Sequence, residues 1–182
     1  MLLICGLGNR GPKYAYTRHN LGYLAVERFS ERFGISLKRK ALGCTVGSGS
    51  GVMLAKADTY MNLTGGPLAA LMRYQGIEAG SLIVVHDDLD MEFGRLKIRW
   101  DGRDGGHKGV RSVIESIGTS DFFRFKVGIG RDPAMLPEDY VLSRFSPGEA
   151  EELGEILDSV ADALDVFIKD GSARAMSMYN NR

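Results

Sequence analysis

The segment LLICGLGNRGPKYAYTRHN (Leu2–Asn20) opens the chain with an apolar run that leads directly into a glycine-rich loop. The run Leu2–Gly6 has the composition of a buried strand, and Gly6, Gly8 and Gly11 fit the G-x-G-x-x-G pattern of dinucleotide-binding α/β proteins. Polar loop residues after a strand are equally typical of a catalytic site, because α/β proteins bind ligands at the carboxyl ends of their strands. The segment therefore predicts an α/β fold and leaves two kinds of site to be distinguished.

The residues after the glycines do not continue as a dinucleotide site requires. In such a site a helix begins at once and directs its N–H groups at the pyrophosphate, and an acidic residue about 20 positions further on binds the ribose. Here Gly11-Pro12 indicates a turn, the helical pattern begins only near Thr17, and the later segment SLKRKALG is basic. Only Lys38 and Arg39, as readers of a 2′-phosphate, favour the nucleotide interpretation, which stays the minor alternative.

Strand-like and helical patterns alternate along the rest of the chain. The strand-like runs are Leu2–Gly6, Leu42–Ser48, Val52–Ala57, Leu82–His86, Arg95–Trp100 and Phe123–Gly130. The helical patterns are Arg18–Phe33, GGPLAALMRYQG, HKGVRSVIESIG and a long C-terminal helix to Lys169 that begins with a capping box of Ser146 and Glu149. The alternation predicts a single α/β domain over residues 1–182, a three-layer sandwich with a mixed, largely parallel, twisted sheet and helices on both faces. It leaves open whether the end, ARAMSMYNNR, packs against this domain.

The bulk composition is typical of a soluble globular protein, with 44% hydrophobic and 25% charged residues among 182. No apolar run reaches the roughly 18 residues that span a bilayer, and no signal-peptide pattern precedes the first strand. Cys5 and Cys44 lie in strand-like contexts without a C-x-x-C motif, which favours buried, reduced thiols. We therefore expect a cytoplasmic protein that does not contact membranes.

The net charge of zero conceals an uneven distribution of charge along the chain. Between Arg95 and Arg131 nine basic residues stand against four acidic ones, and between Asp132 and Asp170 eleven acidic residues stand against two basic ones. Such runs are commonly solvated surface, but a basic stretch gathered on one face can also hold a polyanion. The charge pattern alone leaves both interpretations open.

Candidate catalytic groups follow two of the predicted strands. His19 lies in the loop after the first strand, and the run SLIVVHDDLD ends in His86, Asp87 and Asp88. Because the carboxyl ends of parallel strands share one edge of a sheet, a histidine from one strand can meet a carboxylate from another. Such a pair suits activation of water, since a neutral imidazole takes the proton and the carboxylate fixes its tautomer.

Other chemistries find less support in the residues. The HDD cluster could cap a strand or, with His107, hold a metal, but no H-x-x-x-H or E-x-x-H spacing occurs and the chain has only three histidines. The run GSGSG puts glycine where a G-x-S-x-G elbow needs serine, and both cysteines are expected to be buried. A hydrolase built from these residues would activate water directly.

Four motifs, in their order and spacing, resemble the bacterial-type peptidyl-tRNA hydrolases: GLGNRGPKYAYTRHNLGY, KADTYMNLTG, VVHDDLDMEFGRLKIR and GGHKGVRSVI, followed by FRFKVGIGR. The likeness runs from Leu2 to about Phe167. It implies a compact monomeric α/β enzyme that cleaves the ester joining a peptide to the 3′-terminal ribose of tRNA, with neither metal nor cofactor. The partner that it implies is peptidyl-tRNA, bound at its acceptor end.

The resemblance also assigns catalytic roles to matching positions. His19 corresponds to the general base and Asp87 to its partner. Asn9 and Asn62 correspond to amides that orient the water, the carbonyl and the peptide backbone, with Met61 beside them. Because an amide both donates and accepts hydrogen bonds, these two residues suit substrate binding and support of an oxyanion.

A tRNA-binding surface is implied by the same resemblance. Tyr14 corresponds to a residue that packs near the terminal nucleotide, Gly105 and His107 to the loop that borders the cleft, and Lys97 and Arg99 to a basic edge that meets phosphates. Phosphate contacts give affinity without sequence preference, which suits a substrate class of many tRNAs. The segment 132–170, a loop with the C-terminal helix, corresponds to a lid over the cleft.

Two positions depart from the usual pattern of this family. Lys108 stands in GGHKG where asparagine is usual, and Asp88 stands where glutamate is common. A lysine cannot accept a hydrogen bond, so we expect Lys108 to act as a point-charge contact for tRNA phosphates. The alternative to an enzyme is a non-catalytic RNA-binding member of the same fold, against which the presence of His19, Asp87 and Asn9 speaks.

Overall fold

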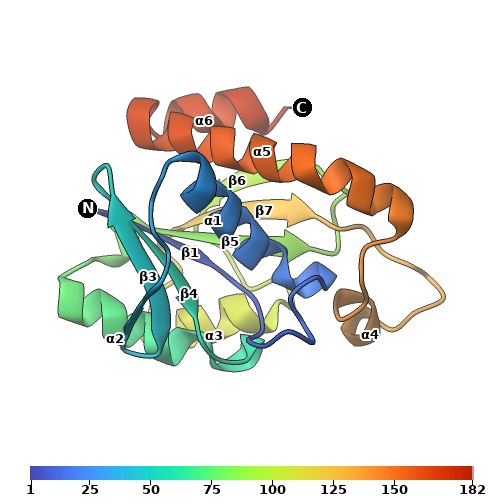
Figure 1. Cartoon of the computed structure of the whole chain (residues 1–182), viewed down its shortest axis with the longest axis horizontal. Coiled ribbons are helices and arrows are strands. Elements are labelled where there is room, and N and C mark those ends of the chain that lie inside the picture. The colour runs from blue at the N-terminus through green and yellow to red at the C-terminus, as the bar shows by residue number, and fades with distance from the viewer. Residues whose placement is uncertain (182) are drawn as a thin grey trace.

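The structure, a computed structural model, describes residues 1–181 and contains a seven-stranded mixed sheet between two layers of helices (Figure 1). Along the sheet the strands are β2 (Arg39–Ala41), β3 (Cys44–Gly49), β4 (Val52–Ala57), β1 (Leu2–Gly6), β5 (Leu82–Asp88), β7 (Phe123–Gly128) and β6 (Leu96–Trp100). Strands β4, β1, β5 and β7 are parallel to one another, and antiparallel pairings add β3, β2 and β6 at the edges. The predicted three-layer α/β class is confirmed.

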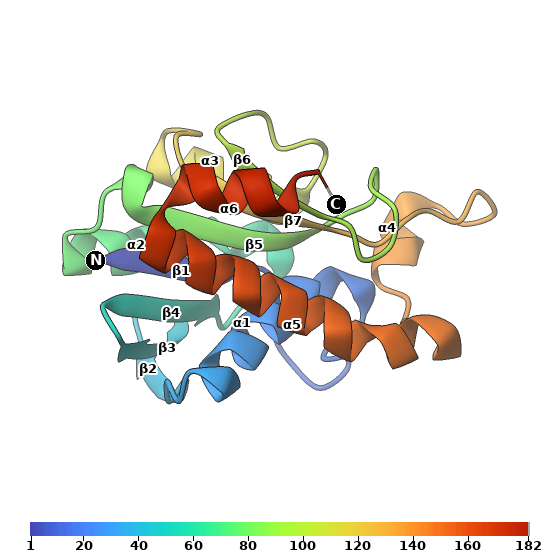
Figure 2. The ribbon, with the colours of Figure 1, turned by 90° about the horizontal axis from the view of Figure 1, so that it is seen from above.

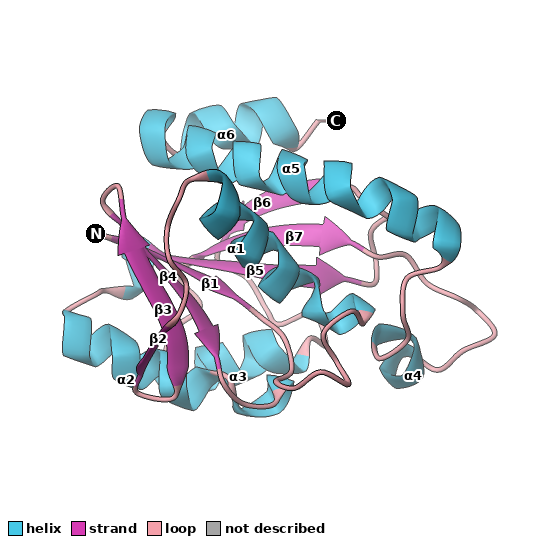
Figure 3. Ribbon diagram, in the orientation of Figure 1, coloured by secondary structure: helices cyan, strands magenta, loops and turns pink. Residues whose placement is uncertain are grey.

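Helices cover both faces of this sheet (Figures 1 and 3). One face carries α1 (Leu21–Arg32), α5 (Pro147–Asp170) and α6 (Ser172–Tyr179), and the other carries α2 (Gly65–Gln75) and α3 (Lys108–Ile117). Seen from above, α5 extends over the sheet beside α1 and α6 (Figure 2). The short α4 (Pro137–Val141) lies beyond the carboxyl ends of β5 and β7, and the 3-10 helices are η1 (Arg18–Asn20), η2 (Met61–Leu63) and η3 (Ala79–Ser81).

The sheet has a separate hydrophobic core on each face, because successive side chains of a strand point to opposite sides. In β5, Ile83 and Val85 pack in the core under α1 and α5, and Leu82 and Val84 pack in the core over α2 and α3. The C-terminal half of α5 belongs to the first core, as the full burial of Leu164 indicates. Strand β5 is therefore buried on both sides, and its polar end emerges only at the carboxyl edge of the sheet.

The glycines of the opening segment allow close packing between helix and sheet. A Cβ on Gly6 would lie 2.2 Å from the carbonyl oxygen of Gly22 in α1, and a Cβ on Gly8 would lie 2.6 Å from the ring of Tyr23. A Cβ on Gly22 would in turn lie 2.2 Å from the carbonyl oxygen of Val85. These positions let α1 lie directly on β1 and β5, which accounts for two of the three glycines without a nucleotide.

The sequence patterns predicted no element at β2 or α4 and left the C-terminal end open. Strand β2 is a short, basic and mostly exposed edge strand, and α4 is a helix of five residues. Helix α6 packs on α5, and its Ala175 and Tyr179 are buried. The second predicted strand begins at Cys44, since Leu42 and Gly43 form a turn with positive φ between β2 and β3.

Two local predictions, the capping box and the buried thiols, are confirmed. The capping box of α5 forms, with Glu149 N–H donating to Ser146 Oγ at 3.3 Å and Ser146 N–H donating to Glu149 Oε2 at 2.7 Å. Cys5 and Cys44 are buried free thiols, and burial raises the pKa of both, that of Cys44 to about 12. In the described part, residues 1–181, no helix combines the length and the apolar character needed to cross a bilayer.

Candidate active site

A cleft of about 970 Å³ opens at the carboxyl edge of the sheet. Its walls come from the loop after β1, from η2, from the end of β5, from the loop that precedes α3, and from α4. The predicted site residues that line it are Asn9, His19, Met61, Asn62, Asp87, Gly105, His107 and Lys108. Tyr14, Lys97 and Arg99 lie outside this lining.

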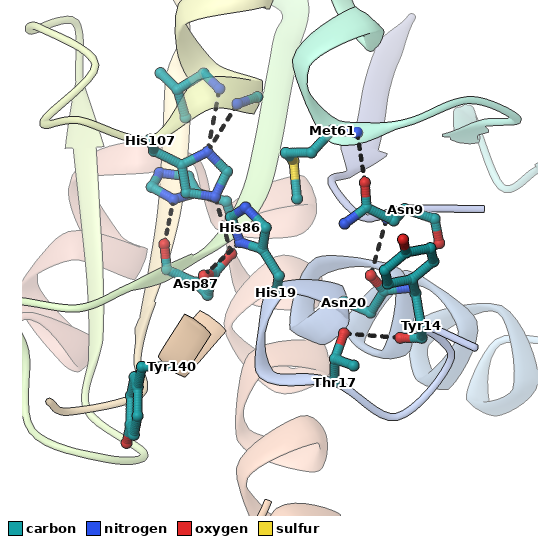
Figure 4. Close-up of polar contacts among 12 residues, drawn as sticks. Asn9, Tyr14, Thr17, His19, Asn20, Met61, His86, Asp87, His107 and Tyr140 are labelled. Carbon is teal, nitrogen blue, oxygen red and sulfur yellow. Dashed lines mark hydrogen bonds and ion pairs between the residues drawn. The ribbon is translucent and has the colours of Figure 1, made fainter. Parts of the chain in front are cut away.

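Asp87 is the centre of the polar network in the cleft (Figure 4). Its Oδ2 lies 2.8 Å from His19 Nδ1, and its Oδ1 lies 2.9 Å from His107 Nε2. The Asp87 residue is only 2% exposed. Burial opposes its ionisation, but the imidazoles of His19 and His107 outweigh burial and hold the pKa of Asp87 well below its ordinary value. The centre therefore contains a carboxylate anion bonded to two histidines.

The tautomer of His107 is fixed by helix α3. His107 is the N-cap of this helix, and its Nδ1 accepts hydrogen bonds from the N–H groups of Gly109 at 3.1 Å and Val110 at 3.2 Å. Because Nδ1 accepts, the proton of the neutral ring is on Nε2, which donates to Asp87. The resemblance placed His107 at the border of the cleft, and the structure adds this direct bond to Asp87, which sequence reasoning had missed.

The orientation of His19 follows from the same carboxylate. With the Nδ1–H of His19 donating to Asp87 Oδ2, the nitrogen left without a proton is Nε2. His19 is 8% exposed and lines the cleft. This is the arrangement in which an imidazole accepts a proton from a bound water.

Asn9 is held so that it presents a donor to the cleft. Asn20 Oδ1 accepts from the Asn9 backbone N–H and Asn20 Nδ2 donates to the Asn9 carbonyl, both at 2.8 Å. The Met61 N–H donates to Asn9 Oδ1 at 2.7 Å. Since a backbone N–H only donates, the amide oxygen of Asn9 must face Met61 and its amino group must face away from it (Figure 4). Asn20, a polar residue of the same loop to which the sequence had assigned no role, is the residue that fixes Asn9.

Met61 and Asn62 form the η2 side of the cleft. Met61 is buried, and α3 begins directly against it, since a Cβ on Gly109 would lie 2.3 Å from Met61 Sδ. Asn62 is exposed and lines the cleft. Met61 therefore forms a wall, and Asn62 is the amide that a ligand can reach.

His86 contacts both Asp87 and His107. Its Nδ1–H donates to the Asp87 carbonyl at 2.7 Å, and its ring packs edge-on to that of His107 at 4.8 Å. Burial, and then the neighbouring His107, lower the pKa of His86 to about 3, so this ring is neutral at physiological pH. Its Nε2 is buried and, among residues 1–181, has no hydrogen-bond partner. His86 is thus a packing partner for His107 and not a proton carrier.

His19, Asp87 and His107 also form a group whose ligand atoms lie within 4.8 Å of one another, as a metal site would need. Both oxygens of Asp87 are, however, bonded to the imidazoles, and the second nitrogen of His107 is bonded to α3. A metal would have to replace both imidazole–carboxylate bonds. The three residues are complete as a hydrogen-bonded centre without one.

Four residues of the basic stretch lie on one side of strands β6 and β7. Lys97 lies directly opposite Lys126, and Arg99 directly opposite Arg124, so that like charges share the same side of the sheet. Like charges in opposite positions destabilise a strand pair. Lys126 is partly neutralised by Asp88, 2.6 Å away. Arg124 is buried, so the accessible positive charge on this side of the sheet comes from Lys97, Arg99 and Lys126.

Arg124 organises the loop that carries Gly105. The Arg124 guanidinium is buried and donates to the carbonyl oxygens of Gly102 and Arg103, the latter at 2.6 Å. Gly105, with φ of 61°, lies in the left-handed region that this turn requires. Sequence reasoning had missed Arg124, although an arginine in the apolar run of β7 was a signal for it.

Two predicted binding residues have different surroundings. Tyr14 packs edge-on against Tyr60 with ring centroids 6.3 Å apart, and Arg10 lies over the Tyr60 ring at 5.6 Å. Lys108 is the exposed first residue of α3, and within residues 1–181 its ammonium has no ion pair. Tyr14 thus belongs to an aromatic and basic cluster after β1, and Lys108 is a cation at the cleft itself.

The expected lid segment, 132–170, divides into two parts. Helix α4 and the residue that follows it contribute Pro137, Glu138, Val141 and Leu142 to the cleft lining. Helix α5 lies along α1, and its C-terminal half is buried in the core. The part of this segment that borders the cleft therefore precedes α5.

The fold and the site together define a class of α/β enzymes in which a histidine–carboxylate centre lies at the carboxyl edge of a sheet covered on both faces. The sequence matches the family model of peptidyl-tRNA hydrolase over residues 3–182. A peptidyl-tRNA hydrolase of Citrifermentans bemidjiense is 42% identical over 99% of this chain and 98% of its own length, and one of Chloroflexus aggregans is 43% identical over 99% of each. The crystal structure of peptidyl-tRNA hydrolase from Acinetobacter baumannii is similar with a TM-score of 0.93 at 30% identity, covering 99% of this chain and 94% of that one. The chain belongs to the peptidyl-tRNA hydrolase family.

Proposed function

We propose that this protein hydrolyses the ester bond between a peptide and the 3′-terminal ribose of tRNA, and so frees the tRNA for reuse. The observation that carries the proposal is the network in which Asp87 joins His19 and His107 beside the fixed donor of Asn9. A general base and an oxyanion donor at one cleft are the two elements that ester hydrolysis by water requires.

His19 is the general base in this proposal. Its Nε2 takes a proton from a water in the cleft as the water oxygen attacks the ester carbonyl carbon. The imidazolium that forms is stabilised by the Asp87 carboxylate, and His107 keeps that carboxylate in place from the other side. His19 then returns the proton to the ribose oxygen as the ester C–O bond breaks, which gives a peptide acid and a free ribose hydroxyl.

Asn9 stabilises the oxyanion of the tetrahedral intermediate. Its amide oxygen is occupied by the Met61 N–H, so the amino group can only donate, and a donor is what a developing oxyanion needs. Asn62, the exposed amide on the same wall, binds the peptide backbone, and Met61 packs against it. An ester needs less protonation of its leaving group than an amide, so one base and these positioned amides suffice.

The nucleic acid part of the substrate is bound by the basic face. Lys97 and Arg99 contact phosphates, Tyr14 packs near the terminal nucleotide, and the loop at Gly105 borders the 3′ end. Lys108 adds a point charge at the N-terminus of α3, where the partial positive charge of the helix already favours an anion. These contacts carry no base preference, which fits a substrate class of many tRNAs.

The proposal extends to the working form of the protein. We propose a cytoplasmic monomer, as the family resemblance implies. The mechanism requires no metal or cofactor, because it uses only proton transfer and hydrogen bonding. The segment 132–146, with α4 on the cleft wall, is the part that we propose as a lid.

Release of free tRNA from N-acetylaminoacyl-tRNA by the purified protein in EDTA tests the function. We expect multiple turnovers by the wild type and a loss of activity in His19→Ala, with binding of deacylated tRNA retained in both. Binding without release by the wild type would instead support the alternative, a non-catalytic RNA-binding protein.

A further inference from the structure

Arg18, the residue directly before the proposed base, makes a set of contacts that lead away from the cleft. It is only 6% exposed, and its Nη1 and Nη2 each lie 2.7 Å from one oxygen of Glu149 in the first turn of α5. Its Nε donates to Ser143 Oγ at 3.1 Å. The guanidinium carbon also lies 4.4 Å from the centroid of the Tyr140 ring in α4. One side chain therefore binds α4, the following loop and α5.

The backbone repeats this connection. The Arg18 N–H donates to the Ser143 carbonyl at 3.0 Å, and Thr17 forms a β-bridge with Arg144. The Tyr140 hydroxyl donates to the Ile129 carbonyl at 2.7 Å, which ties α4 to the end of the β7 segment. The turn that carries His19 and the segment 140–149 thus form one continuous structure.

The far side of that structure is a wall of the cleft. Pro137, Glu138, Val141 and Leu142 line the cleft, while Arg18 itself does not. Arg18 lies behind the wall and is adjacent in sequence to His19, so a displacement of either would be transmitted to the other through the contacts with Tyr140, Ser143 and Glu149.

Partial loss of the ion pair between Arg18 and Glu149 is energetically costly. A buried guanidinium requires a partner, and breaking a buried ion pair by removal of one member leaves an uncompensated charge. The fork geometry demands both carboxylate oxygens of Glu149 at once. Glu149 is itself fixed by the capping box, because its Oε2 also accepts from the Ser146 N–H at 2.7 Å. The connection is therefore present or absent as a unit.

We propose that Arg18 is a positioning residue that couples the α4 wall of the cleft to the general base, so that His19 is aligned with Asp87 only when the wall is in place. The proposal rests on the proposed function, since it assigns Arg18 a role in that reaction. It adds a residue that touches neither the substrate nor the reacting atoms and acts through the segment 140–149.

The chain offers a matched control. Arg28 in α1 pairs with Asp158 in α5 through the same kind of fork, with distances of 2.8 and 2.7 Å. This pair also joins the N-terminal part of the chain to α5, but neither residue lines the cleft and both side chains are 38% exposed. Variants of the Arg28–Asp158 pair therefore show what the loss of any ion pair to α5 does to stability and activity. The additional effect of losing the Arg18–Glu149 pair can then be attributed to its position beside His19.

The test compares Arg18→Gln, Glu149→Gln and their double variant with Arg28→Gln and Asp158→Asn. Glutamine at position 149 keeps the capping box, because glutamine serves there as well as glutamate, so this variant removes the charged fork and preserves the start of α5. The measurements are kcat and KM on N-acetylaminoacyl-tRNA, hydrogen exchange of the amides in 137–146, and the melting temperature, with kinetics well below melting.

We expect kcat to fall by about ten- to a hundredfold in Arg18→Gln and Glu149→Gln, as a misplaced catalytic group does. Exchange in 137–146 should accelerate in both, and the double variant should lose no more kcat than the more severe single variant. The two control variants should lower the melting temperature and leave kcat and this exchange unchanged.

Kinetics of Arg18→Gln that match those of Arg28→Gln would overturn the proposal and leave Arg18 as a core ion pair only. If Arg18→Gln does not fold, Glu149→Gln decides in the same way, since that carboxylate is more exposed and its cap is kept. Absence of tRNA release by the wild type would refute the proposed function instead, so the two failures are distinguishable.

Discussion

Replacement of Asp87 by asparagine tests the centre of the site, because the structure dictates how the amide must turn. Asparagine has one acceptor oxygen and one amino group, and it faces two imidazole N–H groups. His107 cannot change its tautomer, because its Nδ1 accepts from the N–H groups of Gly109 and Val110. The asparagine oxygen must therefore accept from His107, and its amino group must face His19 Nδ1. His19 is then driven to carry its proton on Nε2, where the base should be free.

The size of the effect follows from the bonds that are lost. To act as a base, His19 must return to the Nδ1–H tautomer, and the buried donor that then faces the asparagine amino group costs about 1–3 kcal/mol. The imidazolium also loses its hydrogen bond to a charged group, which contributes about 1.5–3 kcal/mol. Together these amount to roughly 3–6 kcal/mol, or about 10²–10⁴ in kcat at about 1.36 kcal/mol per tenfold change. The substitution preserves the shape of the side chain, so the binding of deacylated tRNA should change little.

Two measurements check this reasoning. Single-turnover kinetics should give the loss in rate, and ¹⁵N shifts of the imidazoles should report the tautomers, which only three histidines make simple to assign. We expect His107 to stay protonated on Nε2 in both proteins and His19 to move from Nδ1–H to Nε2–H in Asp87→Asn. A single-turnover rate of Asp87→Asn within tenfold of the wild-type rate would refute this mechanism, and so would a change of tautomer at His107.

Three further outcomes are expected. His19→Ala should lower kcat by roughly a hundredfold or more, the usual range for a general base, and wild-type turnover would exclude the mechanism. Lys97→Ala and Arg99→Ala should each raise KM and reduce the salt dependence of tRNA binding by about one counterion, with kcat nearly unchanged; an unaltered salt slope would show that tRNA binds elsewhere. Lys108→Ala should weaken tRNA binding at low salt, with the difference closing as screening rises, whereas a large loss of kcat at unchanged affinity would move Lys108 to the catalytic group.

Stability at acid pH provides an independent check on Asp87. Its pKa is held below the ordinary value in the folded protein, so its contribution to stability is present above the unfolded pKa of about 4 and is lost as pH falls from there towards the folded pKa. The free energy of unfolding of the wild type, measured in urea, should therefore fall steeply below about pH 4. That of Asp87→Asn should fall less steeply over the same range. Parallel curves for the two proteins would show that Asp87 is not the anion that the network requires.

The sequence predicted most of the fold because the major elements have strong local signals. Apolar runs of strand length identify β1 and β5, and the capping box identifies the start of α5. The elements that escaped prediction have weak signals for a physical reason. Strand β2 is a basic edge strand with no buried face, and α4 has only five residues and is held by tertiary contacts such as that of Tyr140 with Arg18.

The candidate site was predictable where side chains touch the cleft and not where they act through others. His19 and Asp87 follow strands whose carboxyl ends share an edge, so their approach could be inferred from the order of elements. The bond from Asp87 to His107 depends on how a loop folds onto the start of α3, and no spacing rule gives that geometry. Asn20 and Arg18 belong to the same polar loop as His19, but neither was assigned a role from the sequence, because adjacent residues in a loop do not reveal which of them turn inward.

The glycine pattern that opens the chain shows what a motif can and cannot specify. In this chain, as in a dinucleotide-binding protein, the pattern allows a close approach between the first helix and the sheet, and here Gly6 and Gly8 leave no room for a Cβ. That demand is geometric and is independent of the ligand. The chemistry is set by the polar residues between and after the glycines. Asn9 is held by its hydrogen bond to Asn20, and His19 is bonded to Asp87. A glycine spacing therefore predicts a packing arrangement, and only the polar residues at the strand end decide which reaction that arrangement supports.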